Sequence, residues 1–135
     1  MNQEEFGRRL AAKKAKEAEI SASFATAPDD QILELLYEFI ACKYLLDPED
    51  MSTDDLIALG ERSTAKIAGF QKDGLEFREK SAGCTTASSG VIKKVLLAIA
   101  VGTCIGARLD PDRVAAAETV PQLAELIVHT RAGGA

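Results

Sequence analysis

The chain has 135 residues, of which 47% are hydrophobic and only 5% aromatic, and it contains no Trp. This length suits one domain with a short extension, and a core of Leu, Ile, Val and Ala favours packed helices over a sheet sandwich. The formal net charge of −5 argues against a nucleic-acid-binding protein, because such proteins neutralise phosphates with Lys and Arg. The apolar run from Val95 to Ala107 is shorter than the roughly 20 residues that span a membrane. Since the N-terminus has no apolar signal core, the expected location is the cytoplasm.

Residues 1–28 are expected to form a helical or mobile arm ahead of the main domain, which is expected to occupy residues 29–131. Ala, Lys and Glu dominate residues 1–20, and their large apolar side chains are Phe6, Leu10 and Ile20. A helix with so narrow an apolar side is expected to pack weakly. Residues 21–29 have the composition of a linker.

The first strongly apolar helix is predicted to begin near Asp30 and to end at Asp47-Pro48. Its apolar residues recur every three or four positions. Residues 52–55 resemble a capping sequence, which predicts a second helix with an interruption at Gly60. Residues 69–87 are polar and contain glycine, and a loop is predicted there.

A central buried helix is predicted to start at Ser88 or Ser89, since residues 91–101 are apolar on most sides. Asp110 is expected to cap a short helix with Pro111 at its first position, and Thr119 is expected to cap the last helix. No hairpin turn flanked by alternating strands occurs in the sequence. The predicted fold class is therefore all-α.

Several of these segments follow one another in a characteristic order. Residues 88–99 place a serine at the start of an apolar helix, Leu109-Asp110-Pro111-Asp112 follows as a turn, and Glu118-Thr119-Val120 precedes the last helix. This order resembles the second half of an acyl carrier protein, and residues 46–50 are similar to the turn that closes the first helix of that family. The resemblance covers roughly residues 30–130. It implies a four-helix bundle with an extended connection between the first two helices.

The resemblance also implies a function. Ser89 would carry a 4′-phosphopantetheine arm, whose thiol would hold an acyl or aminoacyl group. The partners would be a phosphopantetheinyl transferase and acyl-processing enzymes, which would dock on a central-helix flank that includes Lys93 and Lys94. The chain itself would not be an enzyme. The start of a helix suits such an attachment, because the unpaired backbone N–H groups at a helix N-terminus favour a nearby phosphate.

Other interpretations remain open at this point. Ser89 can simply cap its helix, and Ser63, which follows Leu-Gly-Glu-Arg, is a rival attachment site. The alternative function is a carrier-fold adaptor or binding module that lacks the prosthetic group. A third hypothesis makes the chain a substrate that is modified at Cys84 or at neighbouring Ser and Thr residues. With one His and no short Cys spacing, a metal site is not expected.

Overall fold

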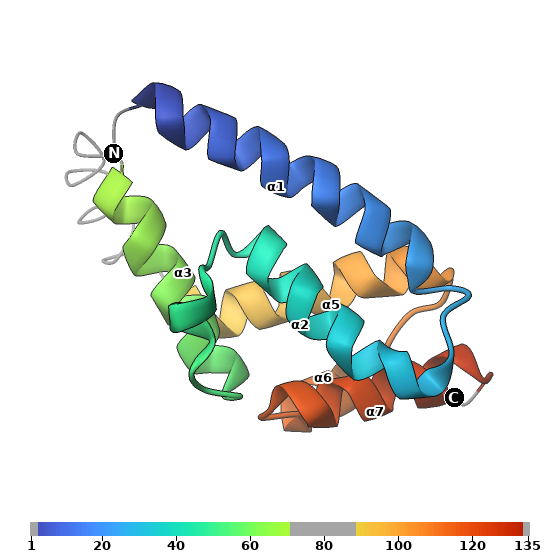
Figure 1. Cartoon of the computed structure of the whole chain (residues 1–135). Coiled ribbons are helices and arrows are strands. Elements are labelled where there is room, and N and C mark those ends of the chain that lie inside the picture. The colour runs from blue at the N-terminus through green and yellow to red at the C-terminus, as the bar shows by residue number, and fades with distance from the viewer. Residues whose placement is uncertain (1–2, 71–88, 134–135) are drawn as a thin grey trace.

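The computed structural model describes residues 3–70 and 89–133 (Figure 1). They form six α-helices and two short 3₁₀ helices: α1 (Gln3–Ser23), η1 (Asp29–Gln31), α2 (Ile32–Lys43), η2 (Pro48–Met51), α3 (Leu56–Phe70), α5 (Ser89–Ile105), α6 (Pro111–Ala116) and α7 (Val120–Arg131). The only β-type pairing in these two ranges is an isolated bridge between Asp55 and Thr119. The predicted all-α fold class is confirmed. None of the helices in the described ranges is long and apolar enough to cross a membrane.

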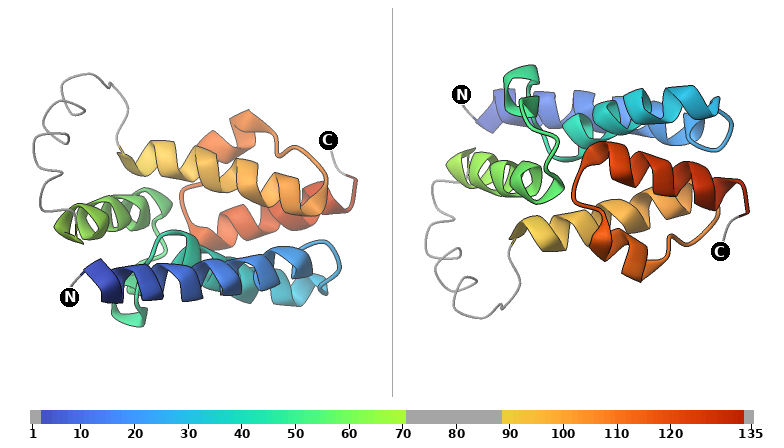
Figure 2. Two further views of the ribbon diagram at one scale, coloured as in Figure 1. Left: turned by 90° about the horizontal axis from the view of Figure 1, so that it is seen from above. Right: turned by 90° about the horizontal axis from the view of Figure 1, so that it is seen from below.

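The helices pack as a bundle around an aliphatic core. α1 packs on α2, α3 packs on α5, and α7 contacts α2, α5 and α6 (Figure 1). Figure 2 shows α1 and α2 on one side of the molecule, α5 and α6 on the other, and α7 between them. The core draws on all six α-helices, and its largest fully buried aliphatic side chains include Leu36, Leu59, Leu97 and Leu123.

The end of α1 and the residues after it contribute to this core, although residues 1–28 were expected to form a helical or mobile arm and residues 21–29 a linker. α1 is helical, as its composition predicts, but Ile20 near its end is buried. Phe24, within the expected linker, is fully buried and its ring meets Phe39 edge to face, with 5.3 Å between the ring centroids. Arg131 at the end of α7 donates a hydrogen bond of 2.8 Å to the Phe24 carbonyl. These contacts attach residues 20–24 firmly to the rest of the bundle.

The helix boundaries follow local capping chemistry. Asp110 and Thr119 cap α6 and α7 as predicted, and Thr119 forms a reciprocal capping box with Gln122. α2 begins at Ile32, two residues later than predicted, because residues 29–31 form a 3₁₀ turn. It ends at Lys43, and Leu45 then adopts a left-handed backbone conformation with a φ of 57°. In this conformation the Leu46 backbone N–H donates a hydrogen bond to the Ala41 carbonyl oxygen, five residues earlier. The bond gives a partner to one of the carbonyls at the helix end that have none within the helix.

Two glycines allow α3 and α5 to cross at very short range. α3 continues through Gly60, so the interruption predicted there is absent. A Cβ atom placed on Gly60 would lie 2.8 Å from the Gly90 Cα, and one placed on Gly90 would lie 2.3 Å from the Ile57 carbonyl oxygen. Both values are below any normal contact distance. The backbones therefore touch at this crossing, and no larger residue fits at either position without moving a helix.

Candidate functional site

Ser89 is the first residue of α5 and its side chain is half-buried. The backbone N–H groups of the first turn of such a helix have no partner within the helix. The next residue, Gly90, lies at the crossing with α3, where any side chain would collide with the Ile57 backbone. Ser88, Cys84 and most of the predicted loop at residues 69–87 lie outside the described residues.

A groove of about 790 Å³ lies between α5 and α6. This volume is in the range of pockets that hold small molecules. Most of its wall is apolar, and the residues described in that wall are Ile57, Val91, Lys94, Val95, Ala98, Ile99, Gly102, Thr103, Gly106, Ala107, Arg108, Leu109, Pro111, Val114 and Ala115. The groove therefore runs along the helix that begins with Ser89. Val95 lies about 9 Å along the helix axis from Ser89, from the rise of 1.5 Å per residue.

The outward face of α5 carries more exposed apolar surface than the sequence predicts. Four large side chains on it are 40–60% exposed: Ile92, Val95, Leu96 and Ile99. The prediction of a central buried helix is therefore correct for only one side of α5, where Leu97 and Val101 are fully buried. The helix is apolar on most sides, so its pattern could not indicate which side faces the core.

The two lysines that were expected to share a docking surface have different environments. Lys93 is half-buried, and its ammonium lies 5.3 Å from the centroid of the Tyr44 ring. Burial, together with the positive charge of Lys43, lowers the pKa of Lys93. Lys94 is only 5% exposed, and its Nζ donates to the carbonyl oxygens of Ala115 at 3.1 Å and Ala117 at 3.0 Å. The expectation for Lys94 was wrong, because its ammonium holds the end of α6 inside the molecule.

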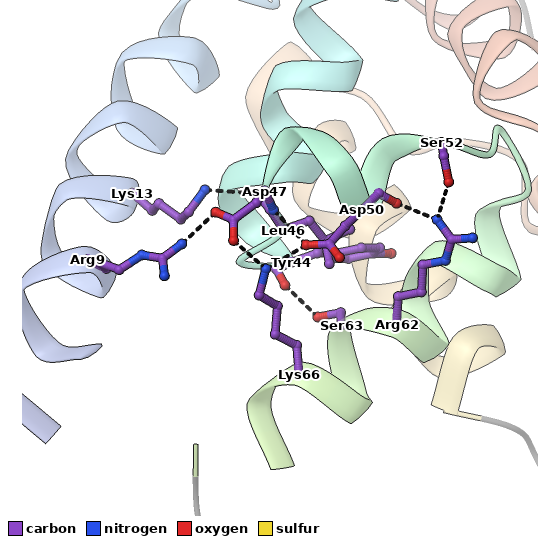
Figure 3. A network of polar contacts seen from close by, with 10 residues as sticks. All are labelled: Arg9, Lys13, Tyr44, Leu46, Asp47, Asp50, Ser52, Arg62, Ser63 and Lys66. Atoms are coloured by element: carbon purple, nitrogen blue, oxygen red, sulfur yellow. Dashed lines mark hydrogen bonds and ion pairs between the residues drawn. The ribbon is translucent and has the colours of Figure 1, made fainter. Parts of the chain in front are cut away.

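The rival attachment site does not present its hydroxyl to solvent. Ser63 is completely buried, and its Oγ donates a 2.8 Å hydrogen bond to the Tyr44 carbonyl oxygen (Figure 3). A transferase could not reach this oxygen without opening the contact between α3 and the end of α2. Ser63 is therefore excluded as an attachment site in the folded protein.

An ion-pair network surrounds that contact and joins three elements (Figure 3). The Lys66 Nζ on α3 lies 2.6 Å from the Asp47 Oδ2 and 2.5 Å from the Asp50 Oδ2, and Arg9 on α1 reaches the Asp47 Oδ1 at 2.5 Å. The hydrogen bonds from Lys66 hold the pKa of both carboxyls below the usual value. Burial alone would lower the pKa of Lys66, but its bonds to the two carboxylates raise it. We interpret the cluster as a structural clamp, since its carboxylates are already paired with cations.

A metal centre is not formed by the part of the chain that the structure describes. No group of three or more His, Cys, Asp or Glu side chains in residues 3–70 and 89–133 is arranged to hold an ion.

Comparisons with protein-family models, with curated proteins and with solved structures found no match to this chain.

Proposed function

We propose that this chain is a small carrier protein, located in the cytoplasm, and not an enzyme. It would hold an acyl or aminoacyl group as a thioester on a 4′-phosphopantetheine arm attached to Ser89. In this proposal α2, α5, α6 and α7 correspond to the four helices of a carrier bundle. α3 would then lie within the extended connection, and α1 would be an addition to the bundle.

The observation that carries the proposal is the apolar groove along α5, the helix that begins with Ser89. An arm attached to the Ser89 Oγ would start at one end of this helix, and an aliphatic acyl chain could enter a groove with walls of Val, Ile and Ala. The residues present fit the arm in two respects. The Ser89 side chain is partly exposed, and the first turn of α5 offers backbone N–H groups to a phosphate. When bound, the arm would supply a thiol on a flexible tether.

The test is the intact mass of the protein after co-expression with a broad-specificity phosphopantetheinyl transferase. We expect a gain equal to one phosphopantetheine group. Ser89→Ala should abolish the gain, whereas Ser63→Ala should keep it, since the Ser63 hydroxyl is buried. Circular dichroism of both variants shows whether they are folded. A gain that persists in folded Ser89→Ala, or its absence in the wild-type protein, would contradict the proposal.

The exposed apolar face of α5 supports a second candidate, an adaptor module without a prosthetic group. Ile92, Val95, Leu96 and Ile99 form an exposed apolar row of the kind that protein partners cover. The adaptor hypothesis predicts that co-expression with the transferase leaves the mass of the protein unchanged. It also predicts that a partner protein binds the unmodified chain. Leu96→Asp should then abolish the interaction, while Ser89→Ala should leave it unchanged.

A further inference from the structure

Lys94 places a buried positive charge in the wall of the apolar groove. Its side chain is more than nine-tenths buried, and it lines the groove between α5 and α6. An ammonium has three N–H donors, and two of them bond to the Ala115 and Ala117 carbonyls. No carboxylate among the described residues forms a salt bridge with it. One donor is therefore left without a partner in this part of the chain, and the charge is offset there by the carbonyls at the end of α6 but by no carboxylate.

The other charged residue described in the groove wall, Arg108, is also positive. Of the groove residues that the structure describes, only Lys94 and Arg108 are charged, and none is acidic. This local balance is the reverse of the chain as a whole, whose formal net charge is −5. A buried ion without a counter-ion is unfavourable. A ligand that supplied both an anion and an apolar tail would match both properties of this wall.

We infer that the groove binds a free aliphatic carboxylate without covalent attachment. The carboxylate would accept the remaining N–H of Lys94, and the tail would lie against Val95, Ile99 and Val114. Charge-assisted hydrogen bonds of this kind are about twice as strong as hydrogen bonds between neutral groups. This binding goes beyond the proposed carrier function, because it requires neither Ser89 nor a prosthetic group.

Isothermal titration calorimetry of the wild-type protein with decanoate and with decanol tests the inference. Both probes have the same number of carbon atoms, and only decanoate carries a charge. We expect decanoate to bind about tenfold more tightly, which is the effect of one hydrogen bond between charged groups. Equal affinity for the two probes, or no binding of either, would overturn the inference.

Two variants assign the effect to a residue. Lys94→Met removes the ammonium and keeps a side chain of similar length, so it should make the affinities for decanoate and decanol equal. Arg108→Met removes the other cation, which is exposed, and should leave most of the preference intact. A preference for decanoate that persists in Lys94→Met would refute the role of Lys94. If Lys94→Met does not fold, wild-type NMR with carboxyl-labelled decanoate decides: contacts with the Lys94 side chain support the inference, and their absence refutes it.

The carrier proposal and this inference can fail separately. Ser89→Ala should bind decanoate with the affinity of the wild-type protein, whatever the result of the transferase experiment. Loss of decanoate binding in folded Ser89→Ala would count against the placement of the ligand along α5 beside Lys94.

Discussion

Replacing Gly90 with alanine is expected to force α3 and α5 apart. The added Cβ would lie 2.3 Å from the Ile57 carbonyl oxygen and 2.8 Å from the Ile57 Cγ2. Carbon atoms in favourable contact are about 3.5 Å apart or more, so the helices would have to separate by about 1 Å. Overpacking costs about 1–3 kcal/mol, whereas the better helix propensity of alanine favours the variant by about 1 kcal/mol. Since the obstacle is backbone, which cannot rotate away, we expect the overpacking cost at the upper end of this range, about 3 kcal/mol, and so a net loss of about 2 kcal/mol in the free energy of unfolding.

Urea unfolding followed by far-UV circular dichroism measures this loss, which should come from a lower midpoint with an unchanged slope. Gly7→Ala is the matched control, because Gly7 is also helical but has no atom within 4 Å of an added Cβ. The control should be more stable than wild type by about 0.5–1 kcal/mol. If Gly90→Ala gains stability as the control does, the close crossing of α3 and α5 is wrong.

Three further outcomes follow from the polar contacts. Lys94→Met should lower the free energy of unfolding by about 1–3 kcal/mol in urea titrations, because the Ala115 and Ala117 carbonyls lose a buried donor. An unchanged urea midpoint would contradict this. Asp47 and Asp50 stabilise the fold fully above their ordinary pKa of 3.8, and this contribution should be lost as the pH falls through their lowered pKa values in the folded state. Urea midpoints measured between about pH 2 and pH 7 should show that loss, and Lys66→Met should make it smaller, whereas identical pH profiles would refute the clamp. Thr119→Ala should cost about 1 kcal/mol in thermal or urea unfolding, because α7 loses its cap, and a fully stable variant would argue against that role.

The features that the sequence predicted correctly are local ones. Asp110 and Thr119 cap the helices that follow them, because a cap needs only a side-chain oxygen and the next three backbone N–H groups. The apolar spacing of α2 predicts which of its faces is buried, since three- and four-residue intervals repeat over the whole helix. α5 has no such contrast between its faces, and the prediction for it was correct only in part.

The features that were missed depend on residues far apart in the chain. Phe24 follows a polar helix in which Ile20 is the nearest large apolar residue, so only its contact with Phe39 shows that it is in the core. Lys94 resembles its neighbour Lys93 in sequence, and its burial depends on carbonyls more than twenty residues further along. The groove likewise needs the placement of α6 against α5. One signal was present in the sequence: Gly60 lies within an apolar helical segment and Gly90 lies at the start of another, as small residues at a close helix crossing do.

The hydrogen bond between Arg131 and the Phe24 carbonyl joins residues that are 107 positions apart. The Nη2 atom of the same arginine forms an ion pair with the Asp29 Oδ1 at 2.5 Å. α7 also packs on α2, so the first third of the chain completes its packing only against the last helix. During synthesis on the ribosome, α1 and α2 would emerge with one side still uncovered until α7 had been translated. The first third of the chain should therefore complete its folding only after α7 has been synthesised, and nascent chains that stop before α7 should depend on chaperones to stay in solution.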